Sequence, residues 1–380
     1  MQLVSIEKCE SYNEKEVELS LTKCIDQIEG MKDKLQNKKV LLKVNLLMKK
    51  SPEDAVTTHP GVVEALVRYL QKLNCEVIIG DSPGGPFTEW MLKSIYKASG
   101  MAEVANNTGC QLNYNIESAH IENNKAKMLK SMDIIDVITK VDCVISVAKL
   151  KTHGMMTYTG AVKNLFGVIP GLIKADYHLK MNNTINFAEH LVDICEYVSP
   201  VLSIIDGIEG MEGDGPSAGS KRHVGLLMAS ENPYALDTVA SNIIGIKANM
   251  IPTIIVAKER GIFSGNLNEI NIVGTDVKTI NIPPFTLPKS MNVNFIGGIV
   301  PKFVENVLIN NLRPKPIFDY NKCVSCGDCS RSCPAKVIDM GSGKPVIDLD
   351  KCIRCFCCHE LCPRKAVDIK QHWIYEKVFK

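Results

Sequence analysis

Short apolar runs alternate with longer amphipathic segments over the first two thirds of the chain. Short runs rich in Val, Ile and Leu predict buried strands, and apolar residues spaced three and four apart predict helices. Strands are predicted over 40–45, 76–80, 142–148, 201–205 and 223–229. Helices are predicted over 61–73, 184–197 and 233–244. This alternation indicates an α/β fold, in which a mostly parallel sheet is flanked by helices.

A break in this pattern follows residue 312. A further helix is predicted over 300–312, and Pro314 and Pro316 then prevent its continuation. We therefore expect a first domain over 1–312, followed by a separate and smaller unit.

Cysteines dominate that smaller unit. Nine of the 15 cysteines lie between Cys323 and Cys362, and eight of these form two runs of the form Cys-x-x-Cys-x-x-Cys-x-x-x-Cys-Pro. This spacing is typical of a pair of 4Fe–4S clusters, with the fourth cysteine of each run bound to the other cluster. The predicted ligands are Cys323, Cys326, Cys329 and Cys362 for cluster 1, and Cys352, Cys355, Cys358 and Cys333 for cluster 2.

The two runs are a repeat, so we expect residues 317–370 to form a small α+β ferredoxin-like iron–sulfur domain, with a tail over 371–380. Cys357 stands beside Cys358 but outside the shared spacing, and we interpret it as a packing residue. His359 adjoins a predicted ligand and is expected to tune the cluster by hydrogen bonding.

Composition limits the partners and the compartment. The 44 Lys and Arg residues nearly balance the 42 Asp and Glu residues, which argues against a nucleic-acid partner. No apolar run approaches the length of a membrane span, and the charged N-terminus does not read as a signal peptide. The six cysteines outside the two runs are expected to be small buried residues. We therefore expect a protein of a reducing cytoplasm, in a cell adapted to little oxygen.

Polar residues gather where the predicted strands end, which is where open α/β sheets bind their ligands. Residues 149–175 contain four lysines, one histidine and no carboxylate, a composition suited to an anionic ligand. The predicted ligand-binding residues are Lys149, Lys163, Asn164, Asp81 and Ser82. The predicted catalytic residues are His153 and Lys151, because a histidine titrates near neutrality and could supply a proton. A purely structural role for His153 stays open.

An acidic segment follows the fourth predicted strand. Residues 206–214 contain four carboxylates and no base, and the set Asp206, Glu209 and Glu212 could hold a divalent hard cation such as Mg²⁺. The alternative is that this segment and the lysine-rich one neutralise each other.

Several of these segments resemble the domain-of-unknown-function-362 family, over about residues 38–246. The resemblance lies in 58–61, 149–153, 159–164, 166–171 and 206–213, together with Asp237. It implies an attached ferredoxin domain with two 4Fe–4S clusters, which many members carry, and leaves the reaction open. Asn232-Pro233 stands where the family is expected to have Asp-Pro, so Asn232 keeps only a helix-capping role.

These features predict an iron–sulfur electron-transfer protein. The leading interpretation is an oxidoreductase of the reductase type, which takes electrons from a low-potential carrier and passes them to an anionic small molecule in the first domain. Two alternatives stay open. The chain could be a pure electron carrier or redox sensor whose first domain is a docking surface, or a non-redox enzyme with structural clusters.

Overall fold

The computed structural model describes residues 1–180, 183–289 and 314–371. Its main feature is a nine-stranded sheet with the order β11-β1-β10-β9-β7-β2-β3-β4, to which β8 adds by pairing with β7. The strands are β1 (Gln2–Lys8), β2 (Lys39–Val44), β3 (Glu76–Gly80), β4 (Gln111–Leu112), β7 (Cys143–His153), β8 (Thr157–Thr159), β9 (Leu202–Glu212), β10 (Ser220–Ser230) and β11 (Ile270–Gly274).

The sheet is mostly parallel, as predicted. Strands β9, β7, β2, β3 and β4 run parallel to one another, whereas β10 is antiparallel to both β9 and β1. The carboxyl end of β10 therefore lies at the opposite end of the strands from the carboxyl ends of β2, β3, β7 and β9, where the other polar residues were predicted. Asn232, which follows β10, caps helix α9 (Pro233–Ile243) by accepting hydrogen bonds from two backbone N–H groups.

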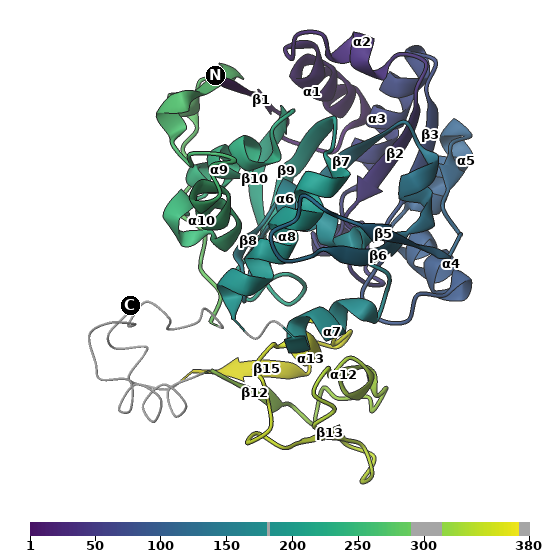
Figure 1. Ribbon diagram of the computed structural model, residues 1–380, viewed down its shortest axis with the longest axis vertical. Coiled ribbons are helices and arrows are strands. Elements are labelled where there is room, and N and C mark those ends of the chain that lie inside the picture. Colours follow the sequence, from purple (N-terminus) through teal and green to yellow (C-terminus); the bar gives the residue numbers. More distant parts are fainter. Residues whose placement is uncertain (181–182, 290–313, 372–380) are drawn as a thin grey trace.

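Helices cover both faces of the sheet and create two cores (Figure 1). Successive residues of β2 enter different cores, because Val40 and Leu42 pack with one set of helices and Leu41 with the other. The first set is α1 (Glu14–Asp26), α2 (Met31–Leu35), α3 (Pro60–Lys72), α4 (Glu89–Ala98) and α5 (Met101–Thr108). The second is α6 (Ala161–Asn164), α8 (Thr184–Val198), α9 and α10 (Pro252–Glu259). Burial on both faces explains why these strands are almost continuously apolar.

Two of the predicted polar segments begin as continuations of strands in the structure. Strand β7 continues to His153 and pairs with β8, and β9 continues to Glu212 and pairs with β10. Polar residues are tolerated there because hairpin pairing satisfies their backbone groups. Strands β5 (Ser118–Glu122) and β6 (Ser131–Ile135) pair with each other and form a separate two-stranded sheet.

The C-terminal module, residues 314–371, lies at one end of the molecule next to helix α7 (Ile173–Lys180) (Figure 1). Its cysteine repeat appears as two short helices, α12 (Asp328–Arg331) and α13 (Cys357–Glu360). Its strands are β12 (Lys315–Phe318), which pairs with β15 (Val367–Lys370), and β13 (Ile338–Asp339), which pairs with β14 (Val346–Ile347). The helix predicted over 300–312 and nearly all of the tail predicted over 371–380 lie outside the described residues.

Candidate active site at the domain junction

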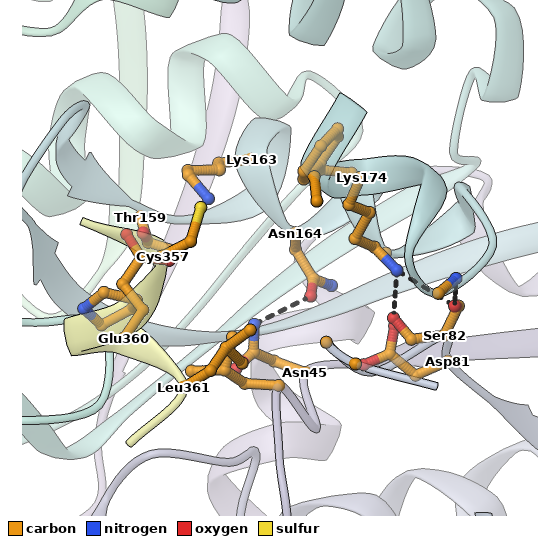
Figure 2. A pocket seen from close by; sticks show the side chains of 18 of the residues that line it. Asn45, Asp81, Ser82, Thr159, Lys163, Asn164, Lys174, Cys357, Glu360 and Leu361 are labelled. Atoms are coloured by element: carbon orange, nitrogen blue, oxygen red, sulfur yellow. Dashed lines mark hydrogen bonds between the residues drawn. The ribbon is translucent and has the colours of Figure 1, made fainter. Parts of the chain in front are cut away.

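A cavity of about 100 Å³ lies between the carboxyl ends of β2, β3 and β7 and the helix α13 of the C-terminal module (Figure 2). Both parts of the chain therefore build it. The α/β part lines it with Lys43, Asn45, Leu47, Asp81, Ser82, Gly84, Gly85, Lys151, Thr159, Lys163, Asn164, Phe166, Gly167, Gly171, Leu172, Lys174, Ala175, His178 and Pro216. The module lines it with Ser332, Cys357, Glu360 and Leu361.

Direct contacts hold the module over the cavity. The Ser217 hydroxyl donates a hydrogen bond to the backbone oxygen of Glu360, and the Lys365 ammonium donates to the backbone oxygen of Gly219 at 3.3 Å. Gly84 packs so closely on Leu361 that a Cβ atom there would lie 2.7 Å from the leucine Cδ2 atom. A residue with a side chain at position 84 would therefore force the Leu361 side chain to move.

One end of the cavity is built from the residues that follow β2 and β3. The Lys43 ammonium forms a buried ion pair with Asp81 at 2.7 Å, and Asp81 also accepts a hydrogen bond from the Leu46 N–H. The Lys174 ammonium donates to the backbone oxygen of Ser82 at 2.6 Å and to its hydroxyl at 3.0 Å. Burial lowers the pKa of Lys174 to about 7.

The middle of the cavity is fixed by Asn164 and Lys151. The Asn164 amide nitrogen donates to the backbone oxygen of Lys43 at 2.9 Å and to the Ser146 hydroxyl at 3.1 Å. The Lys151 ammonium donates to the Asn45 side-chain oxygen and to the Val56 backbone oxygen, both at 2.8 Å. Burial, aided by the charge of neighbouring lysines, lowers the pKa of Lys151 to about 7.

The other end adjoins the module. Lys163 lies with its ammonium 5.7 Å from the centre of the Phe166 ring, and Figure 2 shows it beside Cys357, Thr159 and Glu360. Burial lowers the pKa of Lys163, and the nearby Glu360 carboxylate partly offsets this effect. Within the described part of the chain, the Thr159 hydroxyl has no hydrogen-bond partner although it is buried.

The buried His178, from α7, also lines the cavity. Its Nδ1 atom lacks a hydrogen-bond partner among the described residues. Burial lowers the pKa of His178 to about 3, so the ring is neutral. Its unpaired nitrogen and the Thr159 hydroxyl are groups that a bound ligand would satisfy.

The predicted catalytic His153 does not line the cavity. It is fully buried behind Glu360, and its Nδ1 atom accepts hydrogen bonds from the N–H groups of Met155 at 3.1 Å and Met156 at 3.2 Å. The ring is neutral because burial lowers its pKa well below the usual value, so Nε2 carries the proton. Nε2 lies 3.5 Å from a Glu360 carboxylate oxygen. His153 is therefore a neighbour of Glu360, although its Nε2 atom makes no hydrogen bond among the described residues.

Lys149 also lies away from the cavity. Its ammonium donates to Asp206 at 2.9 Å and to the Tyr12 hydroxyl at 2.7 Å, and both charged groups are fully buried. Asp206 further accepts from the Tyr12 hydroxyl and from the His59 N–H, each at 2.9 Å. The Tyr12 and His59 rings stack with centroids 3.5 Å apart. These contacts form a closed internal network, so the expectation that Lys149 binds the ligand does not fit its position.

The three carboxylates predicted to hold a hard cation each face a base instead. Asp206 pairs with Lys149, Glu209 lies 3.0 Å from His223, and Glu212 lies 3.2 Å from Arg222. Among residues 1–180, 183–289 and 314–371, no group of three or more His, Cys, Asp or Glu side chains is arranged to hold a single metal ion. The hairpin pairing of β9 with β10 spreads these carboxylates along a strand, which removes the reason to expect a cation there.

Replacing Lys149 with methionine is expected to lower the free energy of unfolding by about 3–5 kcal/mol, because Asp206 would keep a buried charge without its counter-ion. Anaerobic urea denaturation followed by circular dichroism measures this change. Methionine at the exposed Lys125 is the matched control, with an expected change within about 0.5 kcal/mol. Equal stabilities of the two variants would show that the network contributes nothing.

The module gathers the predicted cluster ligands into two groups. Cys323, Cys326, Cys329 and Cys362 line one small cavity of the module. In the second group, burial raises the pKa of Cys358 well above its usual value, and the nearby Cys355, Cys352 and Cys333, followed by Cys329 of the first group, raise it further. These sets fit 4Fe–4S clusters, in which each iron takes one protein sulfur rather than all four sulfurs converging on one ion.

The sequence profile of the domain of unknown function DUF362 matches residues 40–242, which is more than half of the chain. The chain belongs to this family. A second profile, of a 4Fe-4S dicluster domain, matches residues 315–363, so the DUF362 protein is also an iron–sulfur protein. Together the two matches cover both walls of the junction cavity.

Two known proteins are similar to this DUF362 chain. The thylakoid-associated protein sll1697 of Synechocystis sp. is 34% identical over 265 residues, which are 68% of this chain and 78% of that protein. The structure of the lactate racemase apoprotein from Thermoanaerobacterium thermosaccharolyticum matches with a TM-score of 0.42 and 10% identity. That match covers 65% of this chain and 58% of the racemase chain.

Five of the seven predicted catalytic and ligand-binding residues line the cavity, namely Lys151, Lys163, Asn164, Asp81 and Ser82. Sequence reasoning missed the contributions of Lys43, Lys174, Thr159 and His178. It also missed Cys357 and Glu360, because nothing in the sequence placed the module against the lysine-rich strand end. The available signal for a special position in the module was Cys357, the extra cysteine that departs from the repeat.

Proposed function

We propose that this protein is a reductase of a small anionic substrate, which binds in the junction cavity. One observation carries the proposal. Cys357 and Glu360 line the cavity, and the predicted cluster ligand Cys358 lies between them in the four-residue helix α13. When bound, the two 4Fe–4S clusters would supply electrons one at a time. A substrate in the cavity would thus lie next to the source of its electrons.

The residues of the cavity fit the handling of such a substrate. Lys151, Lys163 and Lys174 would offset the negative charge of the substrate, and the full burial of Lys151 and the partial burial of the other two strengthen this attraction. Burial raises the pKa of Glu360, which favours the protonated form of this carboxyl group. Glu360 would therefore donate a proton to the substrate, with the neutral His153 ring 3.5 Å from its carboxyl group. A two-electron reduction would take up two electrons and two protons in total.

Electrons would enter at the far side of the module. Cys326, a predicted ligand of cluster 1, is exposed, as are Val324 and Tyr320 nearby. A low-potential electron carrier could approach the predicted cluster 1 on this face. The same exposure favours a second candidate function, that of a pure electron carrier, in which the cavity plays no part.

We place this activity in a reducing cytoplasm with little oxygen. All cysteines of the described residues are free, and four of the six outside the module are buried. No helix among the described residues combines the length and apolar character needed to cross a bilayer.

The direct test is anaerobic reduction of the purified protein with dithionite, followed by mixing with a panel of reducible organic acids. Stopped-flow absorbance follows the return of the oxidised cluster colour, and mass spectrometry measures the product. We expect at least one acid to reoxidise the protein with one product formed per two electrons. Lys163→Met should slow that step at least tenfold.

Reoxidation that is equally slow with every acid, and fast only with a second redox protein, would support the carrier function instead.

A further inference from the structure

The charges that line the cavity limit the class of substrate that it can bind. Four lysines and two carboxylates face it, so the fully ionised lining has a net charge of +2. Lys43 and Asp81 cancel in their ion pair, whereas Lys151, Lys163 and Lys174 form no ion pair with a described carboxylate. Lys151 is buried, and Lys163 and Lys174 are half-buried. Removing an ammonium from water without a counter-charge is costly, so a ligand with two negative charges would stabilise this site.

The unpaired lysines are spread over the length of the cavity. Figure 2 shows Lys163 at the end next to Cys357 and Glu360, and Lys174 with Ser82 and Asp81 at the other end. Asn164 lies between the two ends and is held by two buried hydrogen bonds. A ligand with an acid group at each end would match this arrangement of the lysines.

Unsatisfied neutral groups accompany the lysines. The Thr159 hydroxyl and the His178 Nδ1 atom are buried, belong to side chains that line the same cavity and lack a partner among the described residues. A buried polar atom without a partner is costly, so both atoms point to a ligand that hydrogen-bonds to them. The site therefore offers a ligand hydrogen-bonding groups as well as positive charge.

The volume bounds the size of the ligand. At the roughly 30 Å³ that a water occupies in the liquid, a cavity of about 100 Å³ has room for about three waters. Phe166 is the sole Phe, Tyr or Trp side chain among the described residues that line it, so no pair of rings can sandwich a base. These features fit a small organic acid and not a nucleotide or a flavin.

Resting on the proposed function, we infer that the substrate is a small dicarboxylate that bridges the cavity. One carboxylate binds at Lys163 near the module, and the other binds at Lys174 near Ser82. Lys151 and Asn164 lie along the chain that joins them.

Anaerobic isothermal titration calorimetry of the oxidised, cluster-loaded protein tests this inference without turnover. The probes are the saturated dicarboxylates from malonate to adipate, the monocarboxylate of matching chain length for each, and inorganic phosphate. We expect one dicarboxylate to bind at least tenfold tighter than both its monocarboxylate and phosphate. The affinity should also pass through a maximum with chain length. These comparisons need only the unaltered protein.

Two variants then locate the carboxylates. Lys163→Met and Lys174→Met should each bring the affinity for the best dicarboxylate down to that for a monocarboxylate, with the module's visible absorption unchanged. Lys125→Met is the matched control and should leave the affinity within twofold. Equal binding of monocarboxylate and dicarboxylate, or phosphate binding as tightly as the best dicarboxylate, would overturn the inference.

The two proposals fail separately. If monocarboxylic acids bind as well as dicarboxylates and still reoxidise the reduced protein, the bridging ligand is wrong and the reductase stands. If dicarboxylates bind with the expected length dependence but no acid reoxidises the protein, the binding site stands and the reductase is wrong.

Discussion

Replacing Cys358 with alanine is expected to remove about half of the iron and to abolish anion binding in the cavity as well. Cys358 is a predicted ligand of one of two clusters with about four irons each. It also lies in α13, which has four residues and cannot be stable as an isolated helix. Loss of its ligand would therefore release Cys357, Glu360 and Leu361 from the cavity wall. An iron assay and calorimetry with a dicarboxylate measure the two effects.

The adjacent cysteine provides the matched control for this experiment. Cys357 is equally buried but stands outside the shared spacing, so Cys357→Ala should keep the full iron content. If Cys357→Ala lost as much iron as Cys358→Ala, the assignment of the cluster 2 ligands would be wrong. If Cys358→Ala kept its anion affinity, the cavity would not depend on the module.

Anion binding is expected to weaken as the pH rises above 7, by up to about tenfold per pH unit for each of two lysines. Burial lowers the pKa of Lys151 and of Lys174 to about 7, so below pH 7 both are charged and the affinity should level off. Above pH 7 each lysine is neutral in the free protein and must take up a proton before it can pair with the anion. Calorimetry in buffers of different ionisation enthalpy counts these protons.

Lys151→Met should reduce the proton uptake at pH 8 by about one, whereas Lys125→Met should not change it. A pH-independent affinity between pH 6 and pH 9 would show that these lysines do not hold the anion as ammonium groups. An affinity that rises with pH would contradict the anionic ligand itself.

The sheet and its helices could be predicted because the local pattern and the tertiary structure agree. Strand β3 has the bounds predicted for it, and α3 and α8 differ from their predictions by one residue at an end or at both. Each is a segment whose apolar periodicity matches the face it buries. The cysteine repeat was equally readable, because cluster ligation fixes the spacing in the sequence itself.

Long-range pairing explains what could not be predicted. Lys149 and Lys151 are two residues apart in β7. Lys149 pairs with Asp206 in a closed network, whereas Lys151 binds Asn45 and lines the cavity. A register shift between Lys149 and Lys151, where β7 pairs with β9, separates their positions. The position of Glu360 depends on how the module docks, which no local pattern encodes.

The reductase depends on one spatial relation, that the anion in the junction cavity lies beside one of the two clusters. Pulsed electron–nuclear double resonance on the reduced protein with saturating inorganic phosphate measures this relation, since phosphorus-31 carries a nuclear spin. We predict a phosphorus coupling to the electron spin of one cluster and none to the other, lost in Lys163→Met. Phosphate that binds in the cavity, as shown by its loss in Lys163→Met, without coupling to either cluster would contradict electron transfer to a ligand at this site.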